Sequence, residues 1–438
     1  MKTGEDYFFL NRESYYEMGA VNGAVYNLYT GDVFAIESPL ANILELFENK
    51  GLSINEAIRS VQSSKNVDEK AIYEQLKQLE KLDLGEFHTN RIFVEKLKPE
   101  NTKRNRLTEG TSLQLEMLWL KITNSCDLRC IHCCEPDGTV AKCGCSVNGV
   151  KPEDSLTVDE FKKIIDDAKL FNCREIRFIG GEPLLRKNDL ISLIKYARQI
   201  EIPFLSVVTN GILFDSEVID KLADHKVHFK ILFHSHNESI HDSMAGMEGS
   251  YRKVLAAIKK IKEKNYSMDV NIIVTKHNQG DLKETIGFLK QLGIEKIQFQ
   301  VLKTEREEVF ASAMKTALFK TTAFFPKVRK DQFFLYRECS PCWLGKLSVD
   351  SNGDVFPCLM NQREFIGNVR KMPLANILRE FQQIEKYWYL TKDNVDVCKD
   401  CEFRYACVDC RLTDSMDGSL TGGNKYCRYN PASGEWVS

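Results

Sequence analysis

The chain has 438 residues, 43% of them hydrophobic and 28% charged, which is ordinary for a globular protein of two or three domains. The formal net charge of −2 gives no electrostatic reason to bind nucleic acid or an anionic membrane. No apolar stretch reaches the roughly 20 residues of a membrane span, and residues 1–19 lack the apolar core of a signal peptide. We therefore expect a cytoplasmic protein with no nucleic-acid or membrane partner.

Residues 1–95 are predicted to form a small separate domain. Two short strands are expected within residues 21–36, joined by the turn-forming Thr30-Gly31-Asp32. Three helices follow, at about 38–49, at 53–63 with Ser53 as N-cap, and at 68–82. Residues 96–115 are largely polar and without a clean period, which suits a linker.

Residues 116–305 alternate short apolar strands with amphipathic helices. The strands are expected at 118–123, 175–180, 204–210, 229–234, 269–275 and 296–302. The helices are expected at 157–171, 188–199, 215–224, 250–264 and 281–292. Six such repeats imply a parallel sheet with its functional groups at the carboxyl ends of the strands. The predicted fold class is α/β, with a partial (β/α)6 TIM-type barrel, because a closed barrel would need eight repeats.

The fifteen cysteines are clustered. None precedes Cys126, seven fall between Cys126 and Cys173, and eight between Cys339 and Cys427. Disulfide scaffolds are short and secreted, and scattered core thiols would show no clustering. The distribution therefore indicates ligation of metal ions or iron–sulfur clusters.

The first motif is CxxxCxxC, formed by Cys126, Cys130 and Cys133 at the end of the first barrel strand. Three thiolates can hold three irons of a [4Fe–4S] cluster, and the missing fourth ligand leaves one iron open to a small molecule. Part of a zinc site is the alternative. The next strand ends in Gly180-Gly181-Glu182-Pro183, where glycines allow close approach of the backbone to a ligand.

The triad followed one strand later by GGEP resembles the radical S-adenosylmethionine (SAM) superfamily. The resemblance implies that SAM binds the open iron and is cleaved to a 5′-deoxyadenosyl radical. It implies SAM contacts from the GGEP segment, and from Thr209, Asn210 and His234 after the third and fourth strands, although these three could instead only cap loops. The segment 241–251 is similar to a stretch of the peptide-modifying branches and is interpreted as a turn and helix cap, near the substrate or purely structural.

The C-terminal cysteines form two CxxC pairs, Cys398/Cys401 and Cys407/Cys410, among further single cysteines. A zinc ribbon is one interpretation. The order resembles the SPASM extension of radical SAM enzymes, although its last gap is two residues where three are usual. The resemblance implies two auxiliary [4Fe–4S] clusters, making three in all, with Cys339, Cys342, Cys358 and Cys410 on one and Cys398, Cys401, Cys407 and Cys427 on the other. Without Cys339 the first of these would keep an open iron. Residues 306–338 are predicted to be a bridge and 339–438 the SPASM domain.

The strands-then-helices order of residues 20–85 resembles the winged-helix-like (PqqD-like) domains that recognise leader peptides by adding them as a strand to a sheet edge. Together the resemblances imply a maturase of ribosomally made peptides that forms a thioether or carbon–carbon crosslink, with a precursor peptide and an external low-potential electron donor as partners. One alternative is a sulfatase maturase, but this chain has Leu359 at the position where sulfatase maturases have a catalytic Asp. The other alternative is a non-catalytic leader-binding or electron-transfer protein.

Two further expectations concern segments outside these motifs. The insertion at 134–154 leaves the same strand end as the triad, and it is either a lid or substrate clamp or a solvated loop. Because no cysteine precedes Cys126, residues 1–95 are expected to be removable without disturbing any cluster.

Overall fold

The computed structural model describes residues 6–99, 113–133, 154–301, 327–359, 364–380, 382–411, 415, 417–425 and 427–436. The chain divides into two compact units, each built from separate stretches of sequence. We call them the terminal unit (Met1–Arg106, Thr316–Pro341 and Tyr389–Ser438) and the barrel unit (Leu107–Lys315 and Cys342–Trp388). The domain limits expected from the sequence stay a prediction. Residues 134–153 of the insertion predicted at 134–154, and most of the linker and bridge, lie outside the described residues.

The barrel unit contains a sheet in the order β11-β10-β9-β8-β7-β6-β12-β13-β14. The six strands expected from the sequence are present within two residues of their predicted limits. They are β6 (Met117–Lys121), β7 (Glu175–Ile179), β8 (Phe204–Thr209), β9 (His228–Leu232), β10 (Ser267–Val274) and β11 (Ile297–Val301). All are parallel to their neighbours, so their carboxyl ends meet at one edge.

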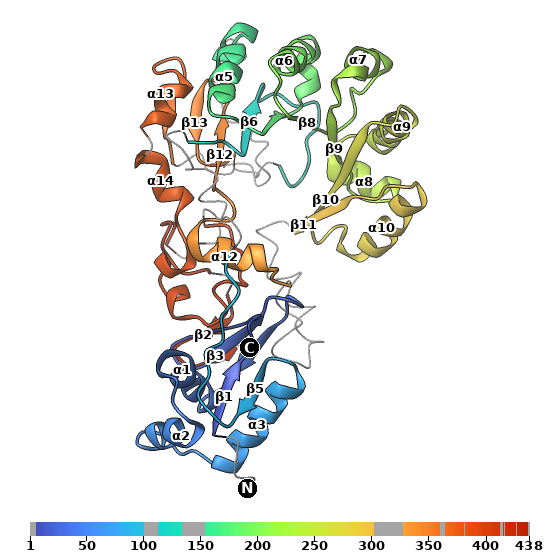
Figure 1. Ribbon diagram of the computed structural model, residues 1–438. Coiled ribbons are helices and arrows are strands. Elements are labelled where there is room, and N and C mark those ends of the chain that lie inside the picture. Colours follow the sequence, from blue (N-terminus) through green and yellow to red (C-terminus); the bar gives the residue numbers. More distant parts are fainter. Residues whose placement is uncertain are drawn as a thin grey trace. The chain divides into compact units, whose positions relative to one another are not determined.

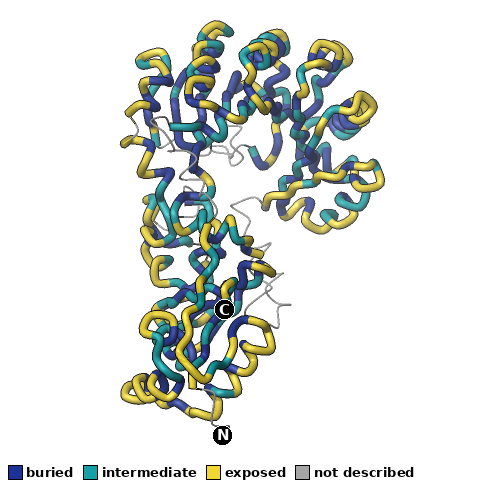
Figure 2. Tube along the Cα trace, viewed as in Figure 1, coloured by how far each residue is buried: buried dark blue, intermediate teal, exposed yellow. Residues whose placement is uncertain are grey.

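Helices cover the outer, convex side of this curved sheet in Figure 1. The expected helices are α5 (Val158–Leu170), α6 (Lys187–Gln199), α7 (Ser216–Leu222), α9 (Ser250–Glu263) and α10 (Leu282–Gln291). At the start of α5, Thr157 and Glu160 form a capping box. Figure 2 shows the strands buried and the outer faces of the helices exposed, which places the apolar core between the two layers. The α/β fold class is confirmed.

Several elements in the described part of the barrel unit were not predicted. Helix α8 (Glu238–Ala245) occupies a segment interpreted as a turn; Asn237 caps it, and it is only eight residues long. Strand β12 (Lys346–Val349) pairs parallel with β6 and so adds a strand to the sheet from beyond the first cysteines of the C-terminal set. Four residues are too few to show a period. β13 (Asp354–Phe356), β14 (Gly367–Asn368), α13 (Leu374–Arg379) and α14 (Gln382–Trp388) follow.

The terminal unit begins with two small antiparallel sheets and three helices. The two predicted strands are β3 (Gly23–Asn27) and β4 (Val33–Ile36), and the predicted helices are α1 (Leu40–Lys50), α2 (Ile54–Gln62) and α3 (Glu69–Lys81). Ser53 caps α2 in a capping box with Glu56, as expected. Strands β1 (Tyr7–Leu10), β2 (Ser14–Met18) and β5 (Gly85–His88) were missed. The sheets have the orders β1-β5 and β2-β3-β4.

The sheet β2-β3-β4, called the N-terminal sheet below, shares a hydrophobic core with α12 (Lys330–Glu338), β15 (Tyr429–Asn430), β16 (Glu435–Trp436) and the cysteine-rich segment. Tyr26 and Phe333 are fully buried there, with ring centroids 4.9 Å apart. The Tyr26 hydroxyl donates to the carbonyl of Glu402 at 2.7 Å, beside Cys401. The expectation that residues 1–95 are removable without disturbing any cluster is therefore wrong, because they supply part of the core under the C-terminal cysteines.

No helix in the described ranges combines the length and the apolarity needed to cross a bilayer.

Candidate active site

The three cysteines of the first motif lie at the carboxyl end of β6. Cys126, Cys130 and Cys133 line one cavity of about 320 Å³. Four residues predicted to contact SAM, Gly180, Gly181, Thr209 and Asn210, line the same cavity. The structure thus brings together motifs that follow three neighbouring strands.

The triad loop rests on the unpredicted helix α8. The backbone N–H groups of Arg129 and Ile131 donate to the carbonyls of Ala245 at 3.2 Å and Met244 at 3.0 Å. Gly246 follows with φ of +65°, and a Cβ there would collide with the carbonyl of Arg129. Glycine is required because the backbone is left-handed and the loop approaches closely. The segment 241–251, similar to a family stretch, thus supports the triad loop.

The glycines of GGEP pack directly against the triad loop. The N–H groups of Gly181 and Glu182 donate to the carbonyls of Thr123 and Ser125, both at 2.9 Å. A Cβ on Gly181 would clash with the Ser125 carbonyl, and one on Gly180 would lie 2.8 Å from that of Thr123. The two loops are therefore held together at a distance that only glycine permits.

Glu182 is fully buried and joins the ends of β7 and β8. Its carboxylate accepts hydrogen bonds from the Thr209 hydroxyl at 2.7 Å, the Asn210 N–H at 2.8 Å and the Leu184 N–H at 2.9 Å. Burial raises the pKa of Glu182 to about 7, against the lowering effect of these bonds. Neither Glu182 nor Pro183 is among the residues that line the cavity, so their contact with SAM stays a prediction.

Cys126 is surrounded by N–H donors. The N–H of Leu128 donates to its Sγ at 3.4 Å, and Nδ2 of Asn210 lies 4.0 Å from the same sulfur while donating to Asp127 at 2.7 Å. Burial raises the pKa of the Cys126 thiol to about 12. The positive charge of a bound metal would stabilise a thiolate at this position, and the two N–H groups suit a sulfur ligand. These residues fit a cysteine-bound iron–sulfur cluster.

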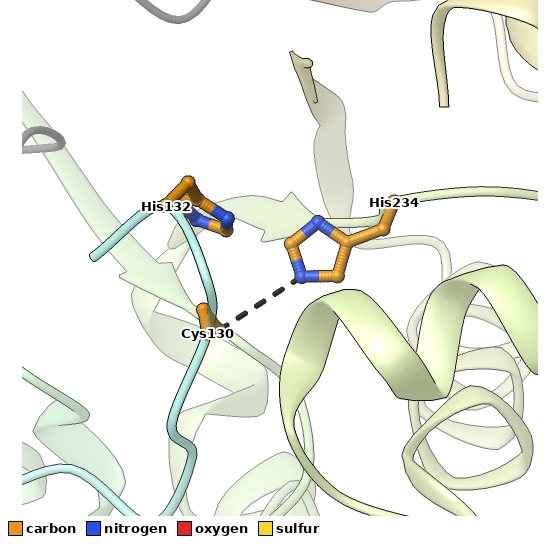
Figure 3. Close-up of side chains that lie close together, drawn as sticks. All are labelled: Cys130, His132 and His234. Atoms are coloured by element: carbon orange, nitrogen blue, oxygen red, sulfur yellow. Dashed lines mark hydrogen bonds between the residues drawn. The ribbon is translucent and has the colours of Figure 1, made fainter. Parts of the chain in front are cut away.

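Two buried histidines flank Cys130, as Figure 3 shows. Nε2 of His234 lies 4.0 Å from the Cys130 sulfur, and the ring of His132 meets that of His234 edge-on, with centroids 5.0 Å apart. One ligand atom from each of the three residues lies within 4.8 Å of the others. His132 was not predicted, although its place within the motif marks it as near the cluster. His234 does not line the cavity, so its direct SAM contact stays a prediction.

Polar side chains from the strands line the rest of the cavity. Arg177 pairs with Glu175 at 2.7 Å and Lys230 with Asp269 at 2.9 Å, which neutralises both cations. Asn271, Gln298, Gln300 and Leu359 also line it. The cavity can therefore hold a substrate group that forms hydrogen bonds close to the cysteines.

Comparison with known proteins supports an iron–sulfur site at the triad. Residues 120–289 match the model of the radical SAM superfamily, and residues 339–402 match SPASM, an iron–sulfur cluster-binding domain. The first range contains the triad and GGEP, and the second begins at Cys339. The chain is a radical SAM enzyme with a SPASM domain.

Two curated relatives are similar to this chain in sequence. This radical SAM enzyme is 24% identical over 350 residues to the AdoMet-dependent heme synthase of Methanosarcina barkeri, which covers 71% of this chain and 95% of the relative. It is 28% identical over 251 residues to the PqqA peptide cyclase of Bradyrhizobium diazoefficiens, which covers 57% of this chain and 60% of that one.

Two solved structures share the fold. Streptococcus suis SuiB bound to its precursor peptide SuiA has a TM-score of 0.52 at 15% identity, covering 95% of this chain and 98% of SuiB. The structure of anSMEcpe with bound AdoMet has a TM-score of 0.51 at 18% identity, covering 71% of this chain and 90% of that one. At these identities the likeness establishes the fold alone.

In the terminal unit of this radical SAM enzyme, four cysteines of the predicted SPASM domain lie close together. Cys407 and Cys427 each raise the pKa of the Cys401 thiol, after burial and Glu402. Cys427 and Cys398 likewise raise the pKa of Cys407, after burial as the main cause. The predicted set Cys398, Cys401, Cys407 and Cys427 is thus one neighbourhood.

Buried cations lie beside these four cysteines. Lys392 pairs with Asp409 at 2.5 Å, and Arg411 pairs with the same carboxylate. The lysine and arginine side chains are 11% and 7% exposed. Two cations share one carboxylate, which leaves a net positive charge, and a thiolate-bound metal centre would balance it.

The other predicted set divides between the units, with Cys339 and Cys410 in the terminal unit and Cys342 and Cys358 in the barrel unit. That set stays a prediction.

Proposed function

We propose that this radical SAM enzyme modifies a ribosomally made precursor peptide and forms a thioether or carbon–carbon crosslink in it. The observation that carries the proposal is a groove in the terminal unit, on the open side of the N-terminal sheet. PqqA peptide cyclase among the relatives and SuiB with its bound precursor peptide among the structures support the same substrate class.

The groove has a volume of about 280 Å³ and lies between β4 and α3. Phe34, Ala35 and Ile36 of β4 form one side, and Leu79 and Leu82 with two glutamines of α3 form another. Tyr429 and Trp436 of the C-terminal hairpin complete the lining. β4 is the last strand of its sheet in the described residues, so its outer edge suits the addition of an extended peptide strand. We propose that the leader of the precursor binds here.

The chemistry is a net two-electron oxidation of the peptide. A reduced cluster on the triad would supply the electron that cleaves SAM to methionine and a 5′-deoxyadenosyl radical, with an external low-potential donor as the source. That radical would take one hydrogen atom from the core peptide. Forming the new bond would release a proton and a second electron, and an oxidised auxiliary cluster would accept that electron. Arg177, Lys230 and the carboxamides of the cavity would orient the core peptide.

We propose three [4Fe–4S] clusters, one on the triad and two on the SPASM cysteine sets given above. The net positive charge around Lys392 supports a negatively charged, thiolate-bound centre at Cys398, Cys401, Cys407 and Cys427. Since thiols and such clusters persist in reducing surroundings, we also propose a cytoplasmic location.

The test is co-expression with a short peptide encoded next to the enzyme, followed by mass spectrometry. The product should be lighter than the unmodified peptide by two hydrogen atoms for each crosslink, and fragmentation should locate the bond. Co-expression with the Cys126→Ala/Cys130→Ala/Cys133→Ala variant provides the matched control. An unmodified peptide with active enzyme, or oxidation of a single Cys or Ser to formylglycine, would overturn the crosslinking proposal.

A further inference from the structure

The histidine at the end of β9 has a fixed position against the triad. His234 is 2% exposed, and its backbone is held on both sides. Its N–H donates to Nδ1 of His241 at 3.3 Å, and its carbonyl accepts from Nδ2 of Asn278 at 2.8 Å. The rings of His132 and His241 pack against it, each with a centroid separation of 5.0 Å. The imidazole therefore has little freedom to turn away from Cys130.

The orientation of the ring decides which atom faces the sulfur. Nε2 lies 4.0 Å from Sγ of Cys130, whereas Nδ1 has no hydrogen-bond partner among the described residues. Figure 3 shows the ring edge directed at the cysteine. A cysteine that ligates iron has lost its proton, so the sulfur can only accept and the imidazole must donate. The tautomer with hydrogen on Nε2 satisfies this contact.

We propose that His234 donates an N–H···S hydrogen bond to Cys130 and thereby raises the reduction potential of the SAM-binding cluster. Hydrogen bonds to cluster sulfurs set the potential because they stabilise the extra negative charge of the reduced state. His234 acts through Cys130, so it is a positioning residue and not a catalytic one. The proposal concerns the reduction step and is independent of the substrate.

The test is a potentiometric titration of the reconstituted enzyme, followed by electron paramagnetic resonance without SAM. Adding SAM to a parallel sample identifies the relevant signal by its shift. His234→Phe keeps a ring for His132 and His241 to pack on but removes the donor. Its cluster should be about tenfold harder to reduce, which corresponds to roughly 59 mV for one electron. His234→Gln, whose amide N–H reaches the place of Nε2, should recover most of the shift.

The control is His236→Phe, because His236 contacts Thr285 at 3.1 Å and, among the described residues, no cysteine. Its potential should equal that of the unsubstituted enzyme. Equal potentials for His234→Phe and the unsubstituted enzyme would overturn the proposal, as would equal shifts for the Phe and Gln variants.

A second measurement does not depend on any variant folding. In the unsubstituted enzyme labelled with ¹⁵N-histidine, pulsed electron paramagnetic resonance of the reduced SAM-binding cluster should show a nitrogen coupling. Absence of that coupling would contradict the hydrogen bond.

Discussion

The two cysteine-rich sites of this enzyme are supported in different ways. The triad loop of the barrel unit is held by backbone hydrogen bonds with GGEP and α8, and uncharged N–H groups face the sulfurs of Cys126 and Cys130. The terminal-unit cysteines instead rest on a core assembled from both ends of the chain, with buried cations beside them. The comparison teaches that ligand spacing alone does not reveal which distant residues a metal site needs.

The largest expected effect breaks the core under the terminal-unit cysteines. Phe333 is fully buried against Tyr15, Tyr26 and Tyr405. Phe333→Ala should cost about 3–5 kcal/mol of stability. Iron bound by the terminal unit should fall while SAM cleavage by the barrel unit persists. Iron analysis and 5′-deoxyadenosine production measure the two effects. The control is Phe93→Ala, at a phenylalanine that is 90% exposed, which should change neither the bound iron nor SAM cleavage. If Phe333→Ala lost SAM cleavage together with the iron of the terminal unit, the two sites would not be supported independently.

A smaller effect sharpens the account of the barrel site. The pKa of Glu182 in the folded protein is raised to about 7. The stability that this group contributes is therefore full at pH values below its pKa in the unfolded chain, and it is lost as the pH rises towards 7. From about pH 5.5 to about pH 7.5 the free energy of unfolding should fall by about 2 kcal/mol from this group. Thermal unfolding of the wild type and Glu182→Gln across this range measures it.

The Glu182→Gln variant should lose this dependence but be less stable at low pH, because its amide cannot accept all three hydrogen bonds. Glu263→Gln, at an exposed position of α9, should retain the wild-type profile. An unchanged profile in Glu182→Gln would mean that Glu182 does not titrate as described.

The smallest effect tests the charge difference between the two sites. Lys392→Met removes one buried cation, and Arg411 still pairs with Asp409. The reduced form of a cluster on the neighbouring cysteines should lose electrostatic stabilisation, so reduction should become about tenfold less favourable. Potentiometric titration of the auxiliary signals measures this shift. The matched control is Lys399→Met, at a half-exposed lysine that pairs with Asp396. An equal shift of the reduction potential in Lys399→Met would refute a specific role for Lys392.

Much of the barrel could be predicted from the sequence, because alternating apolar strands and amphipathic helices have clear periods and the triad, GGEP and Asn210 follow strand ends. Helix α8 and strand β12 could not, since each is short and is stabilised by neighbours distant in sequence. For the same reason, neither the place of His132 nor the role of Glu182 could be predicted. The three hydrogen bonds of Glu182 depend on loops that come together only in the folded chain. The shared core of Tyr26 and Phe333 joins residues too far apart for any local pattern to indicate.

The central claim is that the triad alone generates the radical. Anaerobically reconstituted enzyme should hold about 12 irons and cleave SAM when reduced. Replacing Cys126, Cys130 and Cys133 together by Ala should remove about a third of the iron and all 5′-deoxyadenosine. Cys173→Ala, at a buried cysteine that hydrogen-bonds the Glu175 carbonyl, should retain both. Continued formation of 5′-deoxyadenosine by the triple variant, measured by liquid chromatography and mass spectrometry, would contradict the account.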